Sequence, residues 1–191
     1  MIRFEFCALD YLNNWQRYDR DFCRRLQSAD FEERRKALVD AAKYYRITRN
    51  FKLRFDSGIR LTDIVKVLDS ISGSSVDRDY VSEVEKFTSE INRIYGQRNL
   101  SAASKLLWLK CKCPVIILDS RALKALRKEK KIIEPVSYAN YCDTWLFAFR
   151  NKREEIVSAA AKLESVLEFS FDSKLNKSDI TSLVRNEWVF T

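Results

Sequence analysis

Histidine is absent from the 191 residues of the sequence, and its absence excludes several kinds of catalytic site. Ser-His-Asp and Cys-His catalysis, histidine general acid/base work and histidine-ligated zinc all need an imidazole ring. Any chemistry must therefore use Lys, Asp, Glu, Tyr, Ser or Cys side chains.

Glycine and proline are scarce, at three and two residues respectively. Multi-stranded sheets need these residues in their turns, so the composition disfavours a sandwich or a barrel. Because 46% of the residues are hydrophobic, the chain can fill a sizeable core. We predict an all-α, mostly helical fold in a single domain spanning residues 1–191, within which two helical lobes could form.

Cysteine is present in an odd number and without a paired C-x-x-C motif, which argues against a disulfide framework or a zinc site. The five residues are Cys7, Cys23, Cys111, Cys113 and Cys142. No window approaches the ~18 uncharged apolar residues of a membrane span, and the start MIRFEFCALDYL has no export signal. We therefore expect a cytoplasmic protein with reduced thiols, no bound metal and no membrane partner.

Positive charge is concentrated in one part of the chain. The net charge is +8, and nine basic residues against two acidic ones give residues 105–131 a charge of +7. Clustered Lys and Arg bind phosphates by releasing counterions, so a polyanion is one partner that fits this segment. A solvated helix whose basic end complements its own dipole fits it about equally well.

Apolar residues recur at helical spacing along most of the chain. The expected helices cover residues 8–27, 30–46, 62–71, 84–94, 101–113, 120–131, 137–167 and 178–188. Thr62 and Ser101 are the expected caps of two of them, and Gly96 should end another. The helix over 137–167 should bend or break near Asn151. The alternation in RNFKLRFD at 49–56 suggests a short extended piece, although a frayed helix end fits it almost as well.

Lys105 and Asp119 lie near the two ends of the stretch SKLLWLKCKCPVIILD, residues 104–119. Pro114, between them, is expected to end one helix. From Lys105 to Lys112 a helix advances ~10 Å at 1.5 Å per residue. An extended connector over residues 115–118 can return ~13 Å at 3.3 Å per residue. Asp119 can therefore lie close to the turn that carries Lys105, at the N-terminus of the next helix, where backbone N–H groups favour a carboxylate.

The runs SKLLWL and CPVIILDSRAL resemble the helix-hairpin-helix DNA glycosylase superfamily, and within it the short bacterial proteins of 8-oxoguanine DNA glycosylase fold. The resemblance covers roughly residues 100–126 and elsewhere extends only to the general helical order. In that family a lysine attacks the sugar C1′ and an aspartate stabilises positive charge on the sugar. The matching positions are Lys105 and Asp119. The family's hairpin usually carries Gly-x-Gly, whereas GQRNLSAAS here offers only Gly96.

This resemblance implies a DNA N-glycosylase, with or without lyase activity. A neutral lysine amine is a good nucleophile, and burial or neighbouring cations can lower its pKa enough to supply it. Attack at C1′ displaces the base and leaves an imine, while the carboxylate stabilises the oxocarbenium charge. The reaction needs no metal and no organic cofactor. The target base would have to leave the duplex stack and enter a pocket.

Basic and aromatic residues around this pair are the candidates for nucleic-acid contact. The candidate nucleic-acid-binding residues are Lys110, Lys112, Arg121, Lys124, Arg127 and Lys128. The candidate base-pocket residues are Trp108, Tyr141, Trp145 and Phe149. Aromatic residues at this spacing pack cores more often than they bind ligands. Asp119 is also a good N-cap, and Lys105 could be a solvated lysine.

Three functions therefore compete. The preferred one is a DNA N-glycosylase or lyase using Lys105 and Asp119, with DNA favoured over RNA as its partner. The alternative is a catalytically inactive nucleic-acid-binding or protein-adaptor module of the same fold, and the third is a helical scaffold without a nucleic-acid partner. Short proteins of this fold resemble accessory components of bacterial antiviral operons, including those that signal through cyclic oligonucleotides, which implies protein partners from such an operon.

Overall fold

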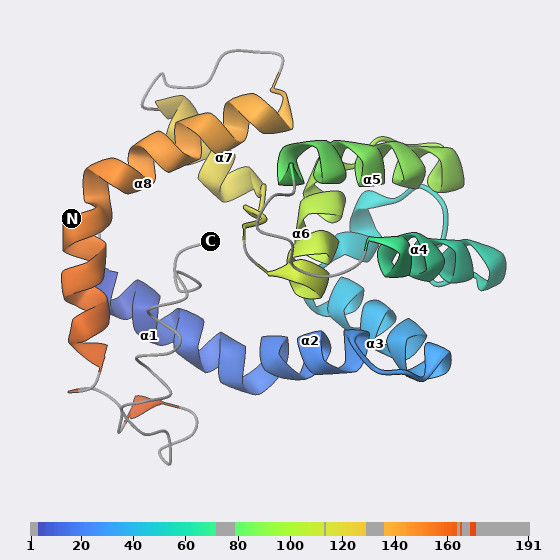
Figure 1. Cartoon of the computed structure of the whole chain (residues 1–191), viewed down its shortest axis with the longest axis horizontal. Coiled ribbons are helices and arrows are strands. Elements are labelled where there is room, and N and C mark those ends of the chain that lie inside the picture. Colours follow the sequence, from blue (N-terminus) through green and yellow to red (C-terminus); the bar gives the residue numbers. More distant parts are fainter. Residues whose placement is uncertain are drawn as a thin grey trace. The chain divides into compact units, whose positions relative to one another are not determined.

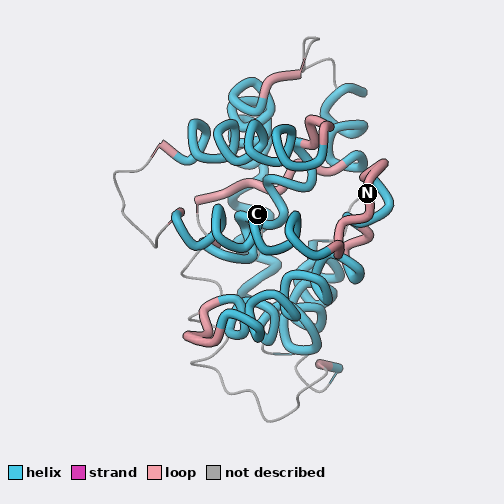
Figure 2. The backbone as a smooth tube through the Cα atoms, turned by 90° about the vertical axis from the view of Figure 1, so that its right-hand side faces the viewer, coloured by secondary structure: helices cyan, strands magenta, loops and turns pink. Residues whose placement is uncertain are grey.

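Helices make up almost all of the regular structure in the described part of the chain. The computed structural model describes residues 4–71, 79–112, 114–128, 136–163, 165 and 169–170. No strand occurs among these residues (Figure 2). The coarse prediction of an all-α fold is therefore confirmed, whereas the specific glycosylase fold stays a prediction. The helix expected over 178–188 lies outside the described residues.

The larger of two compact units, Phe22–Thr144, contains most of the helices. They are α3 (Phe31–Tyr44), α4 (Gly58–Ser70), α5 (Tyr80–Tyr95), α6 (Leu100–Cys111) and α7 (Ser120–Lys128), with the 3-10 turn η2 (Ile47–Asn50). α3 packs against α4, α4 against α5, and α5 against α6 (Figure 1). Fully buried core side chains include Leu38, Ile64, Phe87, Ile91, Leu106 and Leu107. Each such burial contributes about 1.5–3 kcal/mol, so these contacts fix the helices that carry the site.

The smaller unit, Met1–Asp21 with Trp145–Thr191, combines two distant parts of the sequence. α1 (Phe4–Asn14) continues through a π-helical turn, η1 (Trp15–Asp19), into α2 (Arg20–Leu26), which leads into the larger unit. α8 (Tyr138–Ala161) starts in the larger unit and continues through Asn151 without the break that we predicted as one possibility. Within the smaller unit, Glu5 pairs with Lys162 at 3.0 Å.

Helix starts differ from the predicted ones more than helix interiors do. α4 begins after Ser57, and the Thr62 hydroxyl bonds back inside the helix instead of capping it. α6 begins after Asn99, whose side chain accepts a hydrogen bond from the first turn, so Ser101 is not its cap. Gly96 ends α5 as predicted, in the left-handed region at φ 66° that glycine adopts without strain.

The segment RNFKLRFD at 49–56 forms no extended piece. Its start belongs to η2, and Phe51 and Phe55 are buried while Leu53, between them, is 40% exposed. The two rings pack on each other at 5.4 Å and on Tyr95 at 4.7 and 5.5 Å. The segment turns so that Phe51 and Phe55, four residues apart, enter one aromatic cluster. This turn explains the apolar residues at every second position that suggested an extended piece.

Candidate active site

Lys105 lies in the second turn of α6 and keeps partial exposure, although its neighbours Ser104 and Leu106 are completely buried. Burial lowers the pKa of the Lys105 amine, and the charge of Asp119 opposes that shift. Lys105 therefore loses its proton more readily than an exposed lysine does, and it lies near enough to the Asp119 carboxylate to feel its charge.

A tight hairpin, residues 96–99, leads from α5 into the helix of Lys105. The Gly96 amide donates to the Asn92 carbonyl at 2.8 Å and closes α5. The Asn99 side chain accepts from the Ala102 amide at 3.0 Å and opens α6. The arrangement is a helix, a four-residue hairpin and a second helix. The hydrogen bonds at Gly96 and Asn99 thus fix where α5 ends and where α6 begins.

Two tyrosines of α8 hold the connector between α6 and α7. The Tyr138 hydroxyl donates to the Ile116 carbonyl at 2.7 Å and accepts from the Ile116 amide at 3.1 Å. The Tyr141 hydroxyl donates to the Ile117 carbonyl at 2.8 Å. Burial raises the pKa of both phenols, so both hydroxyls keep the proton that they donate. These side chains provide hydrogen-bond partners for the non-helical backbone of the connector.

Ser104 makes the contact that brings the two candidate catalytic residues together. Its hydroxyl accepts from the Leu118 amide at 3.0 Å and donates to the Ser101 carbonyl at 3.2 Å. Ser104 directly precedes Lys105, and Leu118 directly precedes Asp119. The predicted return of the chain after the helix of Lys105 is therefore present, and it places the two residues on neighbouring segments.

Asp119 is the N-cap of α7, as predicted. Its Oδ1 accepts from the Arg121 amide at 2.7 Å and from the Ala122 amide at 2.8 Å. Both bonds use the same oxygen, and within the described part of the chain no hydrogen bond engages Oδ2. The capping role therefore fixes the carboxylate and leaves one oxygen for an electrostatic role beside Lys105.

The exposed face of α7 continues the site with positive charge. Arg121, Lys124 and Lys128 recur at i, i+3 and i+7, and all are exposed, as is Arg127. Leu126 is buried and attaches the helix to the unit. These four of the six predicted nucleic-acid-binding residues are thus accessible to a polyanion, and they begin two residues after Asp119.

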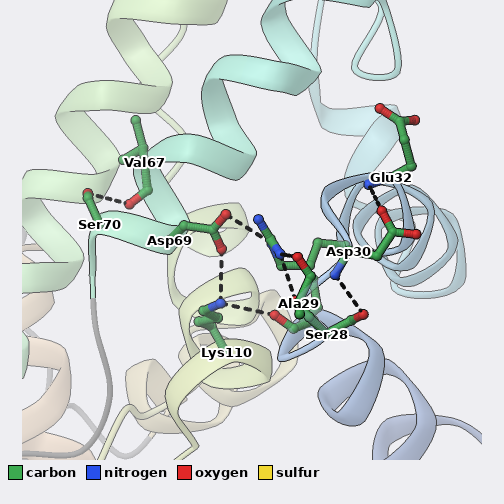
Figure 3. Close-up of polar contacts among 10 residues, drawn as sticks. Ser28, Ala29, Asp30, Glu32, Val67, Asp69, Ser70 and Lys110 are labelled. Atoms are coloured by element: carbon green, nitrogen blue, oxygen red, sulfur yellow. Dashed lines mark hydrogen bonds and ion pairs between the residues drawn. The ribbon is translucent and has the colours of Figure 1, made fainter.

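Lys110, predicted to bind nucleic acid, belongs instead to an internal polar network. Its ammonium binds Asp69 at 3.0 Å and the Leu26 carbonyl at 2.9 Å, and 10% of the side chain is exposed (Figure 3). Arg34 binds the other oxygen of Asp69 at 3.0 Å. The Gln27 side chain donates to the Lys110 carbonyl at 2.6 Å. Lys110 therefore connects α6 to α4 and to the end of α2. Its ammonium is used in these internal contacts and is not available to a phosphate in solution.

Lys112 and Trp108 are both buried, at 7% and 2% exposure. The Lys112 ammonium lies 3.2 Å from the centre of the Trp108 ring, and a desolvated contact of this kind contributes about 2 kcal/mol or more. These positions fit neither the phosphate-binding role predicted for Lys112 nor the base-pocket role predicted for Trp108. The core interpretation of Trp108 holds.

The aromatic residues of α8 divide into two groups. Tyr141 is completely buried on the connector, so its position does not fit a base pocket. Trp145 and Phe149 are partly exposed and stack on each other, with ring centres 5.3 Å apart and planes 10° apart. They belong to the smaller unit, and their role in base binding stays a prediction.

Ser104, Tyr138 and Tyr141 position the site, a role that was predicted for none of them. Tyr141 was predicted only as a base-pocket residue. The available signal for Ser104 is the small-residue run SAAS before Lys105, which lets a second backbone segment approach α6 closely. In this chain the approaching segment brings the Leu118 amide within hydrogen-bond distance of the Ser104 hydroxyl.

Comparisons with protein-family models, curated proteins and solved structures find no match to the chain. No three or more His, Cys, Asp or Glu side chains gather as metal ligands within the described residues. None of the described helices combines the length and hydropathy needed to cross a bilayer. Cys7, Cys23, Cys111 and Cys142 form no disulfide among the described residues, and Cys113 lies outside them. Function must therefore be argued from the chemistry of the site.

Proposed function

We propose that the chain is a DNA N-glycosylase with lyase activity, in which Lys105 is the nucleophile and Asp119 its electrostatic partner. The observation that carries this proposal is the Ser104–Leu118 hydrogen bond at 3.0 Å, which sets the two residues on adjacent segments. The lowered pKa of Lys105 and the rigid capping geometry of Asp119 support it. A partly desolvated amine beside a fixed carboxylate suits attack on a carbon that develops positive charge.

The reaction proceeds with no cofactor. The neutral Lys105 amine attacks the sugar C1′, and the electrons of the N-glycosidic bond leave with the base, which takes up a proton. The new C–N adduct then loses its N–H proton and opens the sugar ring, giving an imine between Lys105 and C1′. Loss of a C2′ proton with departure of the 3′ phosphate cleaves the strand, and water finally releases the lysine. Asp119 stabilises the positive charge on the sugar throughout the first step.

DNA is the partner that this proposal favours. The exposed cations of α7 begin next to Asp119, and they suit phosphates on either side of an extruded nucleotide. The same cations support the second candidate, a nucleic-acid-binding module without catalysis, because phosphate binding does not depend on the state of the Lys105 amine.

A covalent trap separates the two candidates. Borohydride reduces the imine to a stable amine, so wild-type protein should form a protein–DNA adduct on oligonucleotides that carry an abasic site or a modified base. Lys105→Ala should form none. Lys66→Ala, which removes an exposed lysine of α4, should trap like the wild type. Salt-sensitive DNA binding without any adduct on this panel would instead favour the binding module.

A further inference from the structure

A cavity lined by cations lies in the larger unit, and no residue of α7 lines it. Its volume is about 390 Å³, within the size range of small-ligand sites, and it is formed by the end of α3 and the segment 48–56. Lys43, Lys52 and Arg54 contribute the cations, and Asp56 contributes a carboxylate. This segment is part of the RNFKLRFD run, whose alternation of basic and apolar residues the glycosylase reaction leaves unexplained.

The charges of this cavity are not balanced. Arg54 forms an ion pair with Asp56 at 2.7 Å, and the charge of Lys43 also helps to lower the pKa of Asp56. Lys43 and Lys52 are exposed, and neither forms an ion pair within the described part of the chain. Arg46 and Arg49 are also exposed on the same stretch. Two lysines therefore remain to attract an anion.

Another cavity of the same unit, of about 340 Å³, provides a contrast. Its Arg25 binds both Glu33 and Asp40, and its Arg35 binds Glu32. Carboxylates thus already bind Arg25 and one terminal nitrogen of Arg35, although the buried Arg35 Nε makes no hydrogen bond within the described residues. An anion entering there would have to displace carboxylates, whereas one entering beside Lys43 and Lys52 would not.

The cavity beside Lys43 and Lys52 is tied to the hairpin that leads into α6. The Lys52 amide donates to the Gln97 side chain at 3.2 Å. Phe51 and Phe55 form an aromatic wall that packs against Tyr95, whose hydroxyl donates to the Phe55 carbonyl at 2.9 Å. Lys52 therefore stands on a segment that bonds to the hairpin leading into the helix of the candidate nucleophile, while Lys43 stands at the end of α3.

We propose that this cavity binds a phosphate of the nucleic-acid backbone, with Lys43 and Lys52 as the contacting cations. The ligand is a phosphodiester of a polynucleotide rather than a free phosphate or a mononucleotide. A polyanion can contact the two lysines and the neighbouring exposed arginines at once, so it gains binding free energy from all of them. A single phosphate can contact only the residues that line the cavity. The inference extends the proposed function to a second contact with the same substrate, but binding here does not require Lys105 to react.

The test uses the full chain and the anisotropy of a fluorescein-labelled 20-nucleotide DNA, as single strand and as duplex, over a series of salt concentrations. Lys43→Glu/Lys52→Glu should weaken binding by about tenfold or more and reduce the slope of log affinity against log salt by about 2. The control, Lys66→Glu/Lys86→Glu, makes the same charge change at exposed lysines of α4 and α5, of which Lys86 pairs with Glu83 at 3.3 Å. It should change the slope by much less.

Equal losses in the two double variants would overturn the proposal, because net charge alone would then explain binding. Displacement of the DNA by millimolar inorganic phosphate or by a mononucleotide would also overturn it, since the cavity would then hold a small phosphate compound. Borohydride trapping on abasic DNA is measured in parallel. Absence of trapping with a selective loss of binding in Lys43→Glu/Lys52→Glu would reject the glycosylase but support the phosphate site.

Discussion

The protonation of Lys105 is the residue-scale property on which the proposed chemistry depends. Burial lowers the pKa of its amine, and the charge of Asp119 raises it again. Only the neutral amine attacks, so burial increases the reactive fraction at neutral pH while the carboxylate decreases it. The carboxylate compensates at the transition state, where it stabilises the positively charged sugar more than it stabilises the resting ammonium.

Asp119→Asn separates these two effects. Asparagine keeps an oxygen that can cap α7, so the fold should survive, but the negative charge disappears. Removing a charge that raises the Lys105 pKa lets this pKa fall further. Borohydride adduct formation, which rises with pH as the amine loses its proton, should therefore reach half its maximum at a lower pH than in the wild type. Its maximal rate should fall about tenfold or more, since the oxocarbenium charge loses its partner.

The measurement is the rate of adduct formation on abasic DNA across the part of the pH profile where this rate rises with pH. A midpoint that stays at the wild-type pH would show that the two residues are not coupled. A midpoint that moves upward would contradict the assigned sign.

The connector between α6 and α7 is the element on which the site geometry depends. Its Val115 amide donates to the Lys112 carbonyl at 3.0 Å, and three side chains from α6 and α8 bond to the backbone of residues 116–118. Tyr138 satisfies two backbone groups of the connector, while Tyr141 satisfies one. Leaving a buried backbone group without a partner costs about 1–3 kcal/mol.

Tyr138→Phe and Tyr141→Phe should therefore destabilise the protein to different extents. Both substitutions keep the ring and remove only the hydroxyl, so packing is conserved. Tyr138→Phe should lower the free energy of unfolding by about 2–4 kcal/mol and Tyr141→Phe by about 1–2 kcal/mol, because one leaves two groups unsatisfied and the other leaves one. Urea denaturation monitored by circular dichroism measures both. An equal loss in the two variants, or the reverse order, would contradict the role of the Tyr138 hydroxyl.

Elements also differ in how far the sequence could predict them. Apolar spacing located the helix interiors, because it depends only on local periodicity and on which face is buried. Asn99 replaced Ser101 as the cap of α6 because the hairpin after Gly96 is short enough to start the helix two residues earlier. The Tyr138 contact spans 22 residues of sequence, and no local pattern specifies such a pairing.

The total charge is a count of residues, whereas the placement of two of the cations was predicted wrongly. Lys110 and Lys112 lie in the same basic run as the cations of α7, yet α6 directs them inward, to Asp69 and to the Trp108 ring respectively. A count of basic residues cannot distinguish a buried cation that binds another part of the protein from an exposed cation that can bind a ligand. The alternation of RNFKLRFD, in contrast, was assigned to backbone shape, whereas its cations are what line a cavity.

At the scale of the whole molecule, the net charge of +8 is useful for binding only where it is accessible. Two accessible groups stand out in the larger unit: the exposed face of α7 with Arg121 and Lys124, and the cavity with Lys43 and Lys52. No ion pair or hydrogen bond joins the two groups within the described residues. If one nucleic-acid strand contacts both, their contributions to affinity should be independent.

Arg121→Glu/Lys124→Glu tests this independence when it is combined with Lys43→Glu/Lys52→Glu. Each double variant should reduce the salt slope of DNA binding by about 2, and the combined variant should reduce it by about 4, because separate phosphate contacts release separate counterions. The measurements belong in a Lys105→Ala background, so that no covalent step distorts the equilibrium. A combined variant no weaker than the stronger double variant would mean that the strand uses one surface at a time. In protein that retains Lys105, Arg121→Glu/Lys124→Glu should also lower adduct formation when the protein is limiting but not when it is saturating. The two substituted cations bind the substrate, and their loss leaves the Lys105 amine unchanged.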